Sequence, residues 1–120
     1  MKRFFALLSL LLMLACSKST PQLENIDNEI WKNDRNACAG KRKEMLDALK
    51  AQQDKLLALK ETQIVALLGR PDNNELYERN QKFYYYYITP AQACENPDTA
   101  SLQLEIRFNA LGYSKEIYIK

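Results

Sequence analysis

Two different spacings of apolar residues divide this chain of 120 residues. Between residues 40 and 68, apolar side chains recur every three or four positions, which is the spacing of one face of an α-helix. After residue 75 they alternate with polar ones, which is the spacing of a β-strand with one exposed face. The pattern predicts helices first and strands afterwards.

The helical region predicts two helices. The first covers residues 40–59, with a buried stripe at Met45, Leu49, Gln53 and Leu56. The basic residues 41–43 near its start are expected on a solvated face, with contact to lipid phosphate as the alternative. The second helix covers residues 63–68, with Thr62 as N-cap and Gly69 and Pro71 ending it.

Three strands are predicted in the second half of the chain. Residues 83–88 are aromatic or β-branched, residues 102–108 alternate strictly, and residues 113–120 form the last strand. A loop with two prolines covers residues 89–101, and residues 76–78 are open to a further short strand. The expected fold is therefore α+β, with two helices on one face of a three-stranded antiparallel sheet whose other face is wet.

The first fifteen residues differ from the rest. Lys2 and Arg3 precede an apolar run that is too short to span a bilayer, which indicates a secretory signal peptide over residues 1–15. The run ends Met-Leu-Ala before Cys16 and resembles a bacterial lipobox, so lipidation of Cys16 is expected; the alternative is a plain secretory signal with an incidental cysteine. Ser17 favours the outer membrane, and no acidic cluster for surface export follows, so a periplasm-facing protein is expected.

The mature chain is expected to hold one domain. Residues 16–27 are mostly polar and are interpreted as a flexible tether, and residues 28–120 as a single α+β domain. The whole chain has 17 basic and 15 acidic residues, and removing the signal peptide with Lys2 and Arg3 leaves 15 of each. A neutral domain gives no support to nucleic-acid binding.

The chain contains no histidine. Cys–His and Ser–His nucleophile pairs and histidine-dependent zinc sites therefore cannot be built. No glycine run could hold a phosphate, and the loop carboxylates show no recognisable catalytic spacing. We expect no enzymatic activity, no metal and no cofactor.

Two cysteines remain once Cys16 is assigned to lipid. In an oxidising compartment Cys38 and Cys94 are expected to form a disulfide that joins the loop 89–101 to the start of the first helix. Free thiols and intermolecular pairing are the alternatives.

The tyrosine-rich strand is the main candidate for a binding surface. Residues of one parity face the helices and those of the other parity face outward, but both sets contain tyrosine. Cross-strand packing and a protein interface are both open interpretations. The candidate binding face takes in both sets and two neighbours: Tyr84, Tyr85, Tyr86, Tyr87, Arg107 and Tyr118.

A short helix ending in residues 67–72 (LLGRPD), an aromatic strand, and a strand ending Arg107-Phe108-Asn109 before Gly112 together resemble the SmpA/OmlA domain. That family includes the small lipoprotein subunit of the outer-membrane β-barrel assembly machine. The long first helix and the cysteine pair make the chain more similar to lipoproteins of Bacteroidetes-type bacteria that carry this domain. The resemblance spans residues 59–119 and implies an αα-βββ fold and a non-enzymatic protein-binding or scaffolding role in outer-membrane assembly or integrity, with no particular partner. An inhibitor or small-ligand-binding lipoprotein of the periplasm is the alternative, and a purely structural lipoprotein is the third reading.

Overall fold

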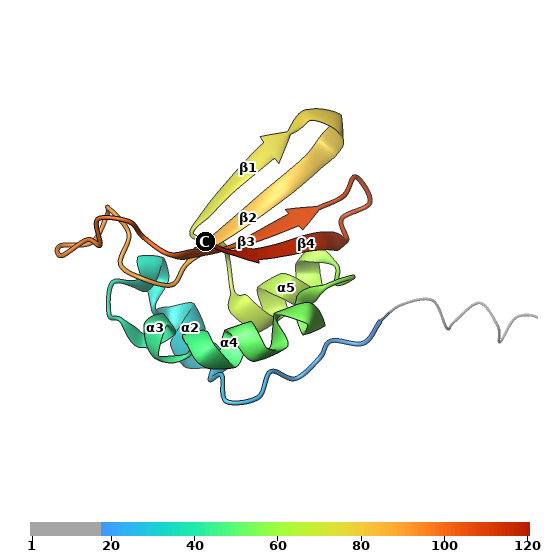
Figure 1. Ribbon diagram of the computed structural model, residues 1–120. Coiled ribbons are helices and arrows are strands. Elements are labelled where there is room, and N and C mark those ends of the chain that lie inside the picture. The colour runs from blue at the N-terminus through green and yellow to red at the C-terminus, as the bar shows by residue number, and fades with distance from the viewer. Residues whose placement is uncertain (1–17) are drawn as a thin grey trace, which may run out of the picture.

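The computed structural model describes residues 18–120, so the expected signal peptide and Cys16 lie outside the described residues. The described chain forms two layers, with helices beneath one face of an antiparallel sheet (Figure 1). The predicted α+β class is confirmed, as is the placement of helices before strands.

The helical layer contains four short α-helices and two of the chain's 3-10 turns. The α-helices are α2 (Asn28–Asn33), α3 (Lys41–Glu44), α4 (Leu46–Gln52) and α5 (Glu61–Leu68), and the 3-10 turns are η2 (Arg35–Ala37) and η3 (Gln53–Leu56). The oxygen Oδ1 of Asp27 begins α2 by accepting hydrogen bonds from the backbone N–H groups of Glu29 and Ile30. Helix α2 was not predicted from the sequence.

The single helix predicted over residues 40–59 is wrong. The backbone leaves helical geometry at Met45 (φ −97°, ψ 4°) and again at Gln52 (φ −133°, ψ 19°). The resulting bends place Gln52 rather than Gln53 on the buried side, between Leu49 and Leu56. Gln52 accepts a hydrogen bond from the backbone N–H of Glu24 and donates one to its carbonyl, which satisfies the buried amide.

Helix α5 begins two residues earlier than the proposed cap at Thr62 implies. Its first turn is closed by Gln63, whose Oε1 accepts the backbone N–H of Lys60 at 2.9 Å. Gly69 ends the helix as expected, with φ of 79°. A Cβ at Gly69 would lie 2.9 Å from Cγ of Lys32, so glycine also permits the close approach of α2.

The sheet has four strands rather than three. They are β1 (Asn73–Tyr77), β2 (Gln81–Tyr87), β3 (Gln103–Phe108) and β4 (Ser114–Ile119), in the order β1-β2-β3-β4 and all antiparallel. The short segment left open near residue 76 is thus a full edge strand, joined to β2 by the 3-10 turn η4 (Glu78–Asn80). Strands β2 and β3 are joined by residues 88–102, a long loop that leaves the end of the sheet opposite the two hairpin turns (Figure 1).

One hydrophobic core fills the space between the layers. The sheet contributes side chains of one parity and the helices contribute their inner faces. Its buried members are Leu23, Ile26, Trp31, Met45, Leu49, Leu56, Leu59, Ile64, Leu67, Leu68, Tyr86, Ile88, Leu104, Ile106 and Phe108.

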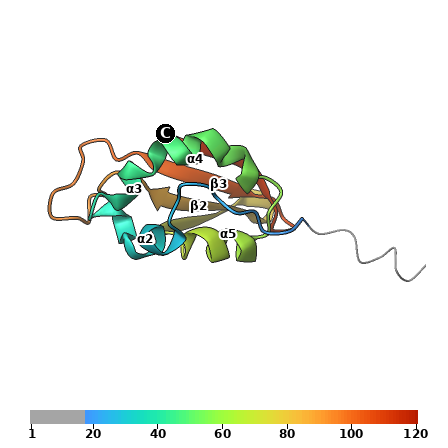
Figure 2. The same ribbon diagram turned by 90° about the horizontal axis from the view of Figure 1, so that it is seen from below.

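Residues 18–27 belong to the expected flexible tether, and the structure shows that they pack against the domain. Leu23 and Ile26 are buried in the core, and Gln52 binds the backbone of Glu24. Residues 18–27 run along the underside of the helical layer, as seen from below in Figure 2. Two apolar side chains in a short polar segment are enough to hold it to the domain, because each finds a site in the core.

No helix within residues 18–120 has the length and apolar character needed to cross a membrane.

Candidate functional site

The candidate site is the outer face of the sheet, on the side away from the helices. Strict alternation along β2 turns Phe83, Tyr85 and Tyr87 to this face. Tyr77 of β1 and Tyr118 of β4 lie on the same face, because they follow the register of Glu75 with Phe83 and of Glu105 with Tyr118. Aromatic side chains therefore come from both edges and from the middle of the outer face.

Three of these rings form a packed row. The ring centroids of Tyr77 and Phe83 are 5.7 Å apart at an angle of 69°, and those of Phe83 and Tyr85 are 6.3 Å apart and nearly parallel. Such geometries are favourable for aromatic pairs, so the row has a defined shape before any partner arrives. Tyr118 stands apart on β4 and is exposed.

Charged side chains surround the rings and pair with one another. Arg107 Nε lies 3.1 Å from Glu116 Oε2, and Lys120 Nζ lies 3.3 Å from Glu105 Oε2 and 5.3 Å from the centre of the Tyr118 ring. The hydrogen bond from Arg107 lowers the pKa of Glu116 and is the main cause of the raised pKa of Arg107. The charges of the outer face are thus largely matched within the face.

Tyr85 is tied to the edge strand through its hydroxyl. That group donates a hydrogen bond to Oε2 of Glu75 at 3.1 Å. Loss of solvent around the ring, followed by this hydrogen bond and the nearby charge of Glu75, raises the pKa of Tyr85 to about 12. Tyr85 therefore presents a neutral ring and an oriented hydroxyl.

The six residues of the candidate binding face do not all lie together. Tyr85, Tyr87, Arg107 and Tyr118 lie on the outer face, whereas Tyr84 and Tyr86 point toward the helices. The fully buried Tyr86 donates its hydroxyl hydrogen to the carbonyl of Gly69 at 2.7 Å, and Tyr84 donates to Oε1 of Glu61 at 3.1 Å. Burial raises the pKa of both hydroxyls. These two tyrosines hold α5 against the sheet.

The candidate binding face predicted from the sequence did not include Tyr77, Phe83, Glu75 or Glu105, although Phe83 was expected on the same side of its strand as Tyr85 and Tyr87. The missing signal was the register between β2 and β3. Tyr84 pairs with Ile106 and Tyr86 with Leu104. Because the inner parity of residues 102–108 is clear from the sequence, that pairing would have fixed the parity of the tyrosine strand.

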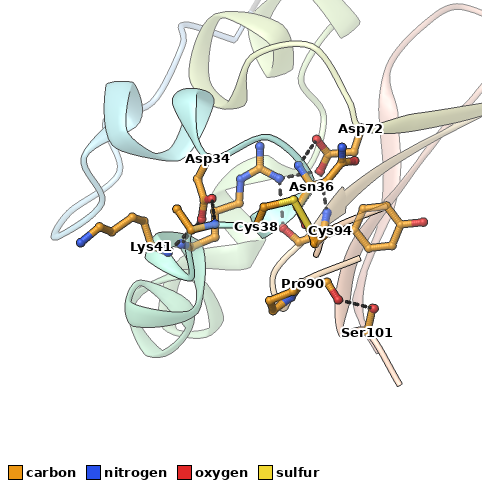
Figure 3. The surroundings of a disulfide bond; sticks show 11 residues. Asp34, Asn36, Cys38, Lys41, Asp72, Pro90, Cys94 and Ser101 are labelled. Carbon is orange, nitrogen blue, oxygen red and sulfur yellow. Dashed lines mark hydrogen bonds and ion pairs between the residues drawn. A yellow bond between two sulfur atoms is a disulfide. The ribbon is translucent and has the colours of Figure 1, made fainter. Parts of the chain in front are cut away.

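The disulfide predicted between Cys38 and Cys94 is confirmed (Figure 3). It joins the loop 88–102 to the turn before α3. The same loop is held by the backbone N–H of Ala91, which donates to the carbonyl of Asn36 at 3.0 Å. The loop is therefore fastened to the helical layer and does not fold over the outer face of the sheet (Figure 1).

A buried ion pair lies beside the disulfide. The guanidinium of Arg42 is fully buried, pairs with the carboxylate of Asp72 and donates to the carbonyl of Tyr87 at 3.0 Å. It also lies 5.0 Å from the centre of the Trp31 ring. Asp72 in turn accepts the backbone N–H groups of Tyr87 and Asn36. The expectation of a solvated or lipid-bound basic cluster at residues 41–43 is wrong for Arg42, which joins the two layers.

Within residues 18–120, no group of three or more histidine, cysteine, aspartate or glutamate side chains is arranged to hold a metal ion. The main surface hollow lies at the β4 edge of the sheet, between that strand and the helical segment containing Lys50, Asp54 and Leu57. It is open to solvent and lies away from the row formed by Tyr77, Phe83 and Tyr85.

No family model, no curated protein and no solved structure matches this chain.

Proposed function

We propose that this protein is a non-enzymatic, lipid-anchored protein of the cell envelope that binds another protein through the outer face of its sheet. The observation that carries the proposal is the aromatic row Tyr77–Phe83–Tyr85 with the exposed Tyr118, bordered by charge pairs that satisfy one another. Tyrosine offers a large apolar body with a polar tip, and protein interfaces are enriched in it.

Two further observations support a protein partner over the alternatives. The row of Tyr77, Phe83 and Tyr85 lies outside the solvent-open hollow that Tyr118 lines at the β4 edge, whereas an inhibitor or small-ligand carrier that encloses its ligand needs a concave apolar site. The long loop 88–102 is tied to the helical layer by Cys94 and Ala91, so it leaves the aromatic row uncovered. A purely structural lipoprotein would have had this face sealed.

The proposal includes the location of the protein in the cell envelope. The lipobox-like sequence before Cys16 supports lipidation at that residue, and Ser17 supports sorting to the outer membrane with the domain in the periplasm. The resemblance to the SmpA/OmlA domain supports a role in outer-membrane assembly or integrity.

The test compares capture of envelope proteins by variants of the lipidated full chain. Replacing both Tyr85 and Tyr118 with threonine removes two rings and puts in their place β-branched residues, which suit a strand. We expect the double variant to lose most of the partner that the wild-type chain captures from detergent-solubilised envelope.

The matched control replaces Lys41 and Lys43 with alanine, since both are exposed on the helical layer and neither lines the hollow beside Tyr118. This control should capture the partner as the wild type does. Equal capture by all three chains would overturn the assignment of the outer face. Release of the wild-type chain from membranes in the same way as a Cys16→Ala variant would overturn the lipid anchor.

A further inference from the structure

The chain enters the domain at a point held by two side-chain contacts. Lys18 Nζ donates hydrogen bonds to the carbonyl of Leu57 at 2.8 Å and to that of Lys55 at 3.4 Å. Gln63 Nε2 donates to the carbonyl of Lys18 at 2.8 Å and to Oγ1 of Thr20 at 3.1 Å. Lys18 is therefore fixed beside the start of α5, at one end of the domain.

The two hairpin turns of the sheet lie at this same end. In both views the start of the described chain, the start of α5 and the hairpin turns are on one side, and the loop 88–102 is on the other (Figures 1 and 2). The backbone confirms the contact of the second hairpin with α5, because the N–H of Glu61 donates to the carbonyl of Gly112 at 3.1 Å. We call this end, formed by Lys18, Leu57, Lys60, residues 76–82 and residues 109–112, the anchor end.

Exposed apolar side chains gather at the anchor end. Leu111 is 81% exposed, Leu76 is 72% exposed and Tyr77 is 61% exposed, and Leu57 is exposed as well. These are four of the six large hydrophobic residues that are exposed within residues 18–120. Leu76 and Leu111 line one shallow hollow between the hairpin turns.

The position of Leu111 is set by its turn. Oδ1 of Asn109 accepts the backbone N–H of Leu111 at 3.1 Å and that of Tyr113 at 3.0 Å. This hydrogen-bonded turn holds the leucine at the tip of the hairpin. Scattered exposed leucines need no explanation, but Leu111 is held at a tip and shares a hollow with the exposed Leu76, which makes an apolar patch; Tyr77 and Leu57 lie at the same end.

Basic residues accompany the patch. Lys18, Lys60, Arg79 and Lys82 lie at the anchor end, against the acidic residues Glu61 and Glu78. The carboxylate of Glu61 already forms an ion pair with Lys82, with Oε1 3.2 Å from Nζ, and accepts a hydrogen bond from the hydroxyl of Tyr84. The remaining balance is positive, which complements the phosphates of a lipid surface.

We propose that the anchor end rests on the lipid surface itself, with Leu111 and Leu76 inserted among the headgroups. The short stretch of chain between Cys16 and Lys18 identifies the lipid surface as what the anchor end contacts. Cys16 is two residues away, so its Cα can lie no farther than about 7 Å from that of Lys18. The inference rests on the proposed lipidation of Cys16, because lipid attached there must enter the bilayer beside the anchor end. Apolar and basic side chains together are the composition that surface-bound segments use.

The test places a fluorescent probe at each end of the lipidated full chain in phosphatidylcholine–phosphatidylglycerol vesicles. Leu111→Trp and Ala110→Trp label the tip of the second hairpin, and Asn96→Trp labels the distal loop. Lipids brominated in their acyl chains quench tryptophan that is within reach. The wild-type chain, with only the buried Trp31, supplies the background.

We expect quenching at Leu111→Trp and Ala110→Trp to exceed that at Asn96→Trp by about twofold or more, because interfacial groups insert about 5–10 Å. Equal quenching at the two ends, in chains that float with the vesicles, would overturn the inference while leaving the lipid anchor intact. A wild-type chain that fails to float with vesicles, like its Cys16→Ala control, would overturn the anchor and the inference together.

Discussion

The buried guanidinium of Arg42 shows what a residue's neighbours in the sequence cannot reveal. Arg42 lies between two lysines, and such a run is usually solvated. Its carboxylate partner, Asp72, is thirty positions away and comes to it only when the layers assemble. A charged side chain enters a core when it is paired and hydrogen-bonded, and neither condition is visible in local hydropathy.

Replacing Asp72 with asparagine should destabilise the fold by about 3 kcal/mol, because a buried Arg42 would lose its counter-charge. Urea unfolding followed by circular dichroism measures the change. The control is Glu78→Gln, which removes a carboxylate from an exposed turn and should change stability by less than about 0.5 kcal/mol. Similar unfolding midpoints for the two variants would contradict the structural role of Asp72.

Tyr85 should ionise near pH 12, above its ordinary pKa of 10.0. A pKa raised in the folded state means that neutral Tyr85 stabilises the fold fully below pH 10, and that this contribution is lost as the pH rises from about 10 to 12. The difference in tyrosinate absorbance between the wild type and Tyr85→Phe isolates this group from the chain's other six tyrosines.

In Glu75→Gln the pKa of Tyr85 should fall toward 10 but stay above it, because desolvation is the largest cause and remains. An unchanged titration in Glu75→Gln would mean that the hydrogen bond between the two side chains is not formed.

At the scale of elements, periodicity located β3, β4 and α5 to within two residues but did not find the bends between residues 40 and 59. Residues 102–108 alternate without exception, so one face of β3 was unambiguous. Residues 40–59 also have a helical period, but a helix continued straight would bury Gln53, and the bends at Met45 and Gln52 turn Gln52 inward instead. Neither proline nor glycine stands between residues 41 and 59, so the sequence carries no local signal for these bends.

The start of the described chain depends on one element, the first turn of α5. Gln63→Glu keeps an acceptor for the backbone N–H of Lys60 but loses the donor to Lys18 and Thr20. We expect the backbone of residues 18–20 to become mobile on the picosecond to nanosecond timescale, with lower ¹⁵N heteronuclear NOE values than in the wild type, while α5 keeps its hydrogen bonds.

NMR relaxation of the ¹⁵N-labelled chain checks this, and Gln53→Glu serves as the matched control because no hydrogen bond of its side chain is found among residues 18–120. Equal heteronuclear NOE values for residues 18–20 in the two variants would show that Gln63 does not hold the segment.

For the whole molecule, the sequence was sufficient for the class, the layer order and the disulfide, because each follows from composition or from a long regular pattern. The sequence did not predict the fourth strand or the packing of residues 18–27 against the domain. β1 is exposed along its whole length and begins with three polar residues, so only its pairing with β2 makes it a strand. For the binding face, the sequence predicted the aromatic strand but not which of its side chains face outward. That choice depends on the register with β3, which lies beyond a loop of fifteen residues, 88–102.

The disulfide should stabilise the whole molecule through the unfolded chain. The two cysteines are 56 residues apart, and closing a loop of that length contributes about 4 kcal/mol in the chain-entropy model. We expect the double variant Cys38→Ser, Cys94→Ser to lose about that much stability in urea unfolding.

Addition of a reductant should lower the stability of the wild-type chain to that of the double variant and leave the double variant unchanged. If the reductant also lowered the stability of the double variant, its effect on the wild type could not be assigned to this disulfide.

The direction of the strands has a consequence for how a partner is met. The hairpin turns lie at the anchor end and the strands run away from it (Figure 1). With the anchor end on the bilayer, the sheet stands upright and its aromatic face looks sideways along the membrane. A partner anchored in the same membrane would then approach by diffusion in two dimensions, at the distance from the bilayer at which the aromatic face lies. Such confinement raises effective concentration without any added contact, so a modest aromatic surface could serve a lasting association.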